Sequence, residues 1–583
     1  MLETGESITT VSMIDTNSTE LISNKTLQDQ ATVSTSDTDL LNLSSVWKQM
    51  SAEITGDIKK IGEKGRAYYI GVYPSDMMVD EDRSVVSVNR IFTNLETIIP
   101  MATSKPAVPV VYPAQDTEKS KEYASLHQKV ITALYKKLDI QSIIEKMVRH
   151  NQIFTVSCIK YGIKNNRITT DYIYPTNLIL DPNATNIDDS EYIGEKIKVV
   201  ASDLIAHYPK YKKFITQQVG WKLGTPVEVI EWWTDDMAFV EYEGKIITKK
   251  KNPHFHYGEQ KAITDEFGKV TMQDTRYNFF EKPKKPYILM QVYNLGNQIP
   301  DETTPLHQSI GLQDSINNRK RQIGDNAEII WNPIRTFKGF TATQIDAIQN
   351  GLDAGDAIFM AEWQDVGYVQ AEPLPAYITN DMADSKAEVD NLFGTHSTTR
   401  GERNEQETAR GREILRAGDE DRQSTIGRSI ERMLAELYRA WTHLIKVYYV
   451  EAQLMPIMGK DKSTEYLKVS RENIEDWMEV EVQAWSTLPD DKTAIAKQAM
   501  DLRGLQSITT EKLYEKLGWE NPVEEAKKFH QESAQAQLEA QEITAKWAQK
   551  TALAQQEVTG GADQMKMIND QIAQIGQSPI PQG

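Results

Sequence analysis

The feature that most constrains this chain is a long helical segment, predicted from residue 406 to residue 450. Its second half carries apolar residues at steps of three and four: Ile426, Ile430, Met433, Leu434, Leu437, Trp441, Leu444, Ile445 and Tyr448. This spacing puts them on one stripe of a helix, and that stripe must be buried. Between Glu402 and Asp421, by contrast, Ile414 and Leu415 are the only large apolar residues. We expect this charged half to bridge solvent or to pack against polar surfaces of neighbouring copies.

The composition describes a large, acidic protein. The chain has 583 residues and a net charge of -19, and its length allows roughly three to five domains or one elaborated fold. An acidic chain does not wrap nucleic acid tightly, because neutralising phosphates requires an excess of Lys and Arg. The charge therefore fits either a path through which DNA slides without sticking or simple solubility.

The cysteine content and the sequence of the N-terminal region exclude several classes of protein. Cys158 is the only cysteine, so no intrachain disulfide forms. It lies in the alternating run Ile153–Ile159, where we expect a buried, unreactive thiol on a strand. No apolar run approaches the ~18 residues of a membrane span, and the N-terminus lacks the pattern of a signal peptide. Residues 1–45 are rich in Ser and Thr, which predicts a disordered arm unless a partner orders it.

A β-rich insert separates two polar helical segments. Short strand patterns begin at Pro226 and predict a small separate domain over residues 226–302, between helical residues 201–225 and 303–331. The insert carries a set of lysines that stands out in an acidic chain: Lys249, Lys250, Lys251, Lys282, Lys284 and Lys285. These lysines fit either a docking surface for a partner or a solvated loop face.

The C-terminal region predicts helix packing between chains. Residues 521–559 form a helical pattern with a loose heptad seam that includes Ile543 and Trp547. We expect these two residues, together with Trp441, to pack between subunits. Gly560-Gly561 is expected to end the helix, leaving residues 560–583 as a flexible tail. The fold class predicted for the whole chain is mixed α+β and mainly helical.

The motifs of common enzymes are missing from the sequence. It contains no phosphate-binding P-loop, no Gly-x-Ser-x-Gly nucleophile elbow and no His-Glu-x-x-His zinc motif. We therefore predict that the chain is not an enzyme, with no catalytic residue, no cofactor and no metal site.

Several short segments, taken in order, resemble the portal protein of tailed bacteriophages, the head-to-tail connector of the podovirus type. Each motif is weak alone, and their order and spacing carry the resemblance. They are Asn89–Phe92, Pro106–Val110, Tyr174–Ala184, Leu312–Asn317 and Glu407–Ala409, followed by Arg422, Ile426, Arg428, Ile430 and Glu431.

The resemblance implies a homo-oligomeric ring of twelve copies at the unique capsid vertex of the virion, assembled in the host cytoplasm. Double-stranded DNA would pass through its channel, independently of sequence, during packaging and ejection. The implied protein partners are the terminase large subunit, a tail adaptor or head-completion protein, and the major capsid and scaffolding proteins, and no membrane is implied. The alternatives are another virion structural or scaffolding protein, or a phage enzyme with an unrecognised site.

The resemblance also implies an arrangement of parts along the chain. The wing would comprise residues 46–200 and 332–393, and the stem helices 201–225 and 303–331, with Pro209 interrupting the first. The clip would be residues 226–302, the tunnel loop 394–405, and a long wing or crown helix 406–450. The crown would follow over residues 451–520, and residues 521–559 would form a crown or barrel helix.

Within this arrangement the tunnel loop would face DNA. Its candidate contact residues are His396, Arg400 and Arg403, which would touch the phosphate backbone without reading sequence. The alternative is that the two arginines pair with Glu402, Glu405 or Glu407 between subunits. The clip lysines would dock the motor or adaptor.

Overall fold

The structure is a computed structural model. It describes residues 35–73, 88–104, 106–164, 167–252, 260–264, 270–274, 282–331, 334–350, 360–369, 373–396, 399, 409–449, 453–458, 464–470, 474–475, 478–483, 500, 503, 509–517 and 522–575. The chain divides into two units, residues 1–489 and 490–583. The fold is mixed α+β and mainly helical, as the sequence predicts.

The first unit contains a five-stranded antiparallel sheet in the order β4-β5-β6-β7-β8. Its strands are β4 (Leu178–Leu180), β5 (Tyr192–Val200), β6 (Pro226–Thr234), β7 (Met237–Tyr242) and β8 (Lys245–Lys251). Side chains alternate between two faces, and both faces are covered. On one face, Trp47 of α2 (Asp37–Met50) packs with Trp232 and Phe239. On the other face lie α3 (Ala52–Ile70), α7 (Ala201–His207) and α8 (Lys212–Val219).

This sheet corrects the prediction that residues 226–302 form a separate domain. β6 pairs with β5 along its whole length, from Pro226 opposite Val200 to Thr234 opposite Tyr192. β11 (Tyr287–Met290) likewise joins β2 (Ser157–Lys164). The insert is therefore continuous with the preceding part of the chain, because β5 supplies a long pairing edge. Among the described residues of the insert, only the hairpin of β9 (Gln260–Thr264) and β10 (Val270–Asp274) forms a sheet of its own.

The predicted first stem helix, residues 201–225, consists of short pieces. α7 ends at His207, η3 covers Pro209–Tyr211, and α8 follows to Val219. Pro209 lacks the N–H that a continuous helix would need there, so the interruption expected at Pro209 is confirmed. Both helices contribute to the core on one face of the five-stranded sheet.

The largest core of the first unit surrounds α12 (Ala409–Tyr448). The predicted stripe is buried from Ile426 to Ile445, which confirms the periodicity. It packs with α4 (Arg90–Ala102), α5 (Glu118–Lys137) and α6 (Ile140–Phe154), and with the sheet β11-β2-β3, where β3 is Arg167–Ile173. Cys158 on β2 is fully buried, and burial raises the pKa of its thiol. Two strand pairs lie beside this core, β1 (Pro109–Tyr112) with β16 (Glu479–Val482) and β14 (Gln453–Met458) with β15 (Thr464–Val469).

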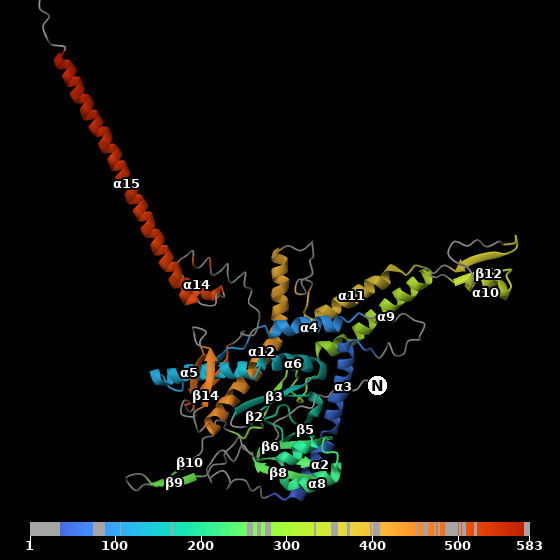
Figure 1. Ribbon diagram of the computed structural model, residues 1–583. Coiled ribbons are helices and arrows are strands. Elements are labelled where there is room, and N and C mark those ends of the chain that lie inside the picture. The colour runs from blue at the N-terminus through green and yellow to red at the C-terminus, as the bar shows by residue number, and fades with distance from the viewer. Residues whose placement is uncertain are drawn as a thin grey trace, which may run out of the picture. The chain divides into compact units, whose positions relative to one another are not determined.

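Two long helices lie side by side in this unit (Figure 1): α9 (Pro305–Trp331) and α11 (Ala376–Phe393). Arg319 of α9 forms an ion pair with Asp381 of α11 at 2.7 Å. Between the two helices the chain forms a small module of β12 (Ile334–Lys338), α10 (Ala342–Asn350) and β13 (Asp365–Val369), in which the two strands pair. α9 confirms the polar helix predicted over residues 303–331.

The prediction of a disordered arm over residues 1–45 is wrong from Asp37 onward. α2 begins there because the Ser36 hydroxyl oxygen accepts a hydrogen bond from the backbone N–H of Asp39, and Asp37 and Asp39 occupy the first turn. Leu40 and Trp47 then bury the apolar side of the helix against the sheet. Residues 1–34 lie outside the described part of the chain.

The second unit contains α14 (Thr510–Lys516) and α15 (Pro522–Ile575). Tyr514 and Phe529 meet edge to face, with ring centroids 6.5 Å apart. The helix predicted over residues 521–559 is present, but the predicted stop at Gly560-Gly561 is wrong, because α15 continues to Ile575. Two helical glycines cost only about 1 kcal/mol each relative to alanine, and good helix formers follow them.

Candidate functional site

The start of the 394–405 loop, which the sequence singles out, is held by a left-handed turn. Gly394 has φ of +66° and ends α11, and the backbone N–H of Thr395 donates to the Asp390 carbonyl at 2.9 Å. A Cβ at Gly394 would lie 2.8 Å from the Cδ of Arg422 on α12. A side chain at this position would therefore be strained by both the backbone conformation and the neighbouring helix.

The end of α11 is fastened to α4. The guanidinium of Arg90 forms a two-point ion pair with the carboxylate of Asp390, at 2.7 and 2.6 Å. The side-chain amide of Asn94 donates to the same carboxylate at 2.9 Å, and the Thr395 hydroxyl donates to the amide oxygen of Asn94 at 3.0 Å. Bidentate Arg–carboxylate pairs fix orientation as well as distance. The loop therefore leaves α11 at a defined point relative to α4.

The first residues of the loop are also fastened to α12. The carboxylate of Asp419 is fully buried and accepts a hydrogen bond from the backbone N–H of His396 at 3.0 Å. Its other oxygen lies 2.5 Å from Nδ1 of His396, and the Thr399 hydroxyl donates to the same carboxylate. We call Asp419, His396 and Thr399 the loop clamp. It fixes the backbone at the start of the loop to α12.

The structure tests the predicted loop contacts only in part. The ring of His396 is engaged through Nδ1 with Asp419. Arg400 and Arg403, the other two predicted DNA contacts, lie outside the described residues, as do Glu402, Glu405 and Glu407.

The predicted docking lysines do not form one free surface. Lys285 is buried and forms an ion pair with Asp235 at 2.7 Å, so its prediction as a docking residue is wrong. Lys249 forms an ion pair with Asp37 at 2.7 Å, and Lys284 forms one with Asp188. Lys250 and Lys251 also have interaction partners, while Lys282 is exposed. Sequence spacing identified these lysines but not the acids that α2 and the neighbouring loops bring to them.

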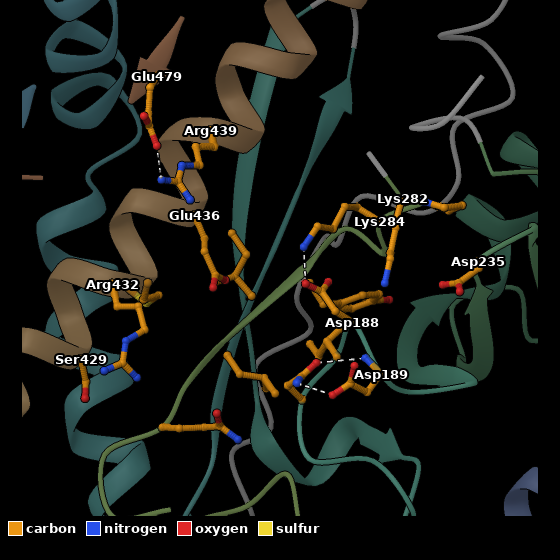
Figure 2. Close-up of a pocket in the computed structure, with 18 residues that line it drawn as sticks. Asp188, Asp189, Asp235, Lys282, Lys284, Ser429, Arg432, Glu436, Arg439 and Glu479 are labelled. Atoms are coloured by element: carbon orange, nitrogen blue, oxygen red, sulfur yellow. Dashed lines mark hydrogen bonds and ion pairs between the residues drawn. The ribbon is translucent and has the colours of Figure 1, made fainter. Parts of the chain in front are cut away.

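Lys282 and Lys284 line an open pocket of about 830 Å³ (Figure 2). Its opposite wall is the α12 face that carries Arg432, Glu436 and Arg439. Figure 2 shows Lys284 directed toward Asp188 and Arg439 toward Glu479, the latter pair at 3.3 Å. Acidic and basic side chains both line the pocket, so it does not select a ligand by one sign of charge.

The predicted inter-subunit residues divide into two groups. Trp441 is fully buried in its own chain, where its indole N–H donates to the Thr170 hydroxyl oxygen at 3.0 Å. Its prediction as an inter-subunit contact is therefore wrong. Ile543 and Trp547 on α15 are 55% and 67% exposed. They remain available to another surface.

Sequence reasoning missed the residues that fasten the loop, namely Arg90, Asn94, Asp390 and Asp419. The pair Phe393-Gly394 at the end of a helical pattern was a signal for the turn. Nothing in the spacing distinguished Asp419 from its neighbours Glu420 and Asp421, which are half-buried and exposed. Within the described ranges, no three His, Cys, Asp or Glu residues gather to hold a metal ion. Nor does any described helix combine the length and apolar character needed to cross a bilayer.

No family model and no curated protein matches this chain. Among solved structures, it is similar to a chain of the neck of an empty GTA particle computed with C6 symmetry. The two chains share 10% sequence identity, the match covers 75% of this chain and 91% of that chain, and the TM-score is 0.35.

Proposed function

We propose that this chain assembles with identical copies into a portal ring through which double-stranded DNA passes. The observation that carries the proposal is the set of large apolar side chains exposed around the module between α9 and α11. Trp331 is 90% exposed and Trp363 is 68% exposed, and Ile330, Met360, Tyr368 and Tyr377 are exposed as well. A concentration of this kind marks a protein interface.

The module is too small to bury these residues itself. Its two strands form a sheet of their own, and α10 is a helix of 9 residues. An isolated two-stranded sheet is marginally stable in water, and both of its outer edges have unpaired backbone groups within the described part of the chain. A neighbouring copy would supply both the apolar cover and the strand partner. Repeated around an axis, such a head-to-tail contact closes a ring.

The α9 and α11 pair supports the same proposal and revises the arrangement of parts. In the family that the sequence resembles, two stem helices flank the clip. We assign α9 and α11 as the stem helices and residues 332–375 as the clip, in place of residues 201–225 and 226–302. The 394–405 loop then follows the second stem helix directly, as a tunnel loop would.

The charge of the chain is compatible with a DNA channel. Copies that each carry a net charge of -19 would surround the axis with a field that repels phosphates, so DNA would slide without sticking. The terminase large subunit, a tail adaptor or head-completion protein, and the capsid and scaffolding proteins are the partners that this function implies. The proposal includes no enzymatic step.

Native mass spectrometry and negative-stain electron microscopy of the purified chain test the proposal. Twelve copies of a 66.2 kDa chain would weigh about 790 kDa and would appear as rings with an axial hole. A scaffolding protein would give assemblies without a hole, and an enzyme would give compact particles of low mass. A folded, monodisperse monomer at high concentration would refute the ring.

A further inference from the structure

The segment from α7 to the start of β6 carries an excess of positive charge. Residues 201–225 contain Lys210, Lys212, Lys213 and Lys222 against one acid, Asp203. All four lysines are exposed, and none forms an ion pair within the described ranges. In a chain with a net charge of -19, such a cluster is a local exception that calls for an acidic partner.

A fifth lysine extends this cluster onto the five-stranded sheet. The Nζ of Lys245, at the start of β8, lies 4.8 Å from the ring centroid of Phe214 and 5.5 Å from that of Tyr211. These cation–π contacts keep Lys245 against α8. We call Lys210, Lys212, Lys213, Lys222, Lys245 and Trp221 the basic surface.

Trp221 projects from the basic surface on an ordered loop. Its side chain is 97% exposed. The loop is fixed at its base because the backbone N–H of Ser202 donates to the Leu223 carbonyl at 3.0 Å, and that of Ala201 donates to the Thr225 carbonyl at 3.1 Å. An exposed tryptophan on a fixed loop loses little entropy on binding, and tryptophan is enriched among residues that dominate binding energies. The occupant should therefore carry both negative charge and apolar groups.

We propose that the basic surface is the docking site for residues 1–34 of the same chain. That segment contains Glu3, Glu6, Asp15, Glu20 and Asp29 against Lys25, a net side-chain charge of -4. It also contains two short apolar groups, Val11–Ile14 and Leu21-Ile22, which would cover the indole of Trp221. The segment thus matches the basic surface both in charge, through its acids, and in apolar character, through the groups that would contact Trp221.

The segment enters the described structure close to this surface. The carbonyl of Thr35 accepts a hydrogen bond from Nζ of Lys249 at 2.8 Å, so the segment leaves the fold beside β8. Lys245, which contacts α8, lies at the other end of the same strand. In Figure 1, α2, β8 and α8 lie close together.

The distance to be covered is short. The path from Lys249 to α8 amounts to about 13 Å along the strand plus about 10 Å across the sheet. A segment of this length spans on the order of 110 Å when extended. Residues near Asp29 can therefore reach the basic surface, and more than half of the segment remains to bind there.

Cross-linking of the full-length chain tests the proposal. A carbodiimide joins carboxylates to amines that are in direct contact, and peptide mass spectrometry locates the links. We expect links from Glu3, Glu6, Asp15, Glu20 or Asp29 to Lys212, Lys213 or Lys222, lost when the five acids are replaced by their amides and weakened by salt. A control in which Lys136 and Lys137, exposed at the end of α5, are changed to Glu should leave the links unchanged. If the full-length chain shows no such cross-links at low ionic strength, the proposal is overturned.

The accessibility of Trp221 supplies a second, independent readout. Acrylamide quenching of the full-length chain, minus that of its Trp221→Phe variant, isolates this indole. We expect the difference signal to be quenched at least twofold more strongly in a chain that lacks residues 1–34. Equal quenching of the two chains would overturn the proposal. It would also be overturned if the full-length chain bound anionic lipid vesicles through these lysines and gave no cross-links.

This inference does not rest on the ring. The mass of each sample, measured in parallel, reports on assembly separately from docking. A chain that forms rings without the cross-links refutes only the docking proposal, and a monomer that shows the cross-links refutes only the ring.

Discussion

Asp419 accepts a hydrogen bond from the backbone N–H of His396 at 3.0 Å, across a sequence separation of 23 residues. The acid belongs to the charged first half of α12 and is fully buried. Its partners lie at the start of the loop that leaves α11. Asp419 belongs to a run of charged residues that would by itself suggest a solvated helix. It nevertheless fixes where the loop begins.

Replacing Asp419 with Ala should loosen the start of the loop. The variant leaves the backbone N–H of His396 and the Thr399 hydroxyl without their acceptor, at a cost of about 2 kcal/mol for local opening. Hydrogen exchange followed by mass spectrometry should show the His396 amide exchanging roughly 30-fold faster. Asp421→Ala, two residues along α12 and exposed, is the matched control and should leave this amide unchanged. Equal rates in both variants would show that the clamp does not hold the loop.

Lys160 is buried between two glutamates, and its loss should destabilise the first unit. Its Nζ lies 2.9 Å from Glu195 and 2.7 Å from Glu231. Burial alone would lower the pKa of Lys160, but the two carboxylates outweigh it and raise that pKa. Lys160→Met leaves two buried carboxylates without a cation, so we expect the free energy of unfolding to fall by about 3–5 kcal/mol. Urea denaturation followed by circular dichroism measures the change.

The control for Lys160 is Lys284→Met. Lys284 forms an ion pair with Asp188, in which the two side chains are 31% and 56% exposed. Solvent screens such a pair, so the loss should stay within about 1 kcal/mol. A Lys160 variant as stable as the Lys284 variant would mean that water or a rearrangement compensates the two glutamates.

The periodicity of the sequence predicted the buried residues better than it predicted what covers them. The buried stripe of the helix now called α12 followed from apolar spacing. Trp441 lies on the predicted buried stripe, but its own chain covers it. A 3.6-residue period identifies a face that needs cover and does not say which surface provides it. The prediction of a separate domain over residues 226–302 was wrong for a similar reason. The pairing of β6 with β5 depends on the tertiary structure, which the strand pattern of the sequence does not encode.

The predicted site was harder to derive from the sequence than the fold. The lysine run at 249–251 and the pair Lys284-Lys285 were recognisable as charge, but ion pairs with Asp37, Asp188 and Asp235 were not. Those acids come from other elements, and pairing depends on distances that spacing does not encode. The loop at Phe393-Gly394 was recognisable because a glycine after a helix has a local conformational cause. Its fastening to Asp419 was not.

Buried histidines should make the first unit sensitive to acid. His127 is fully buried, with Nε2 at 2.7 Å from the Thr442 hydroxyl, and burial lowers the pKa of His127 to about 4. In the unfolded chain this pKa is about 6.5. The neutral ring therefore contributes its full stability above pH 6.5, and that contribution is lost as the pH falls toward 4.

The expected loss from His127 is about 2 kcal/mol between pH 7 and pH 5. Urea midpoints measured across this range should fall less steeply for His127→Gln than for the unmodified chain. Part of the slope should persist, because burial also lowers the pKa of His150 to about 4. His207→Gln, at an exposed position on α7, should reproduce the slope of the unmodified chain. An unchanged slope for His127→Gln would show that this ring is not the acid-sensitive group.

Trp331 and Trp363 should determine assembly rather than folding. Both are mostly exposed in a single chain, so Trp331→Ser with Trp363→Ser should change the free energy of unfolding by no more than about 0.5 kcal/mol. If neighbouring copies cover them, each interface should lose at least about 2 kcal/mol, roughly 30-fold in affinity. Sedimentation velocity should then show the ring replaced by smaller species at micromolar concentration. Trp221→Ser removes an equally exposed tryptophan from a surface outside the proposed contact, so its sedimentation should match that of the unmodified chain. A ring that survives loss of both tryptophans would mean that its subunits meet elsewhere.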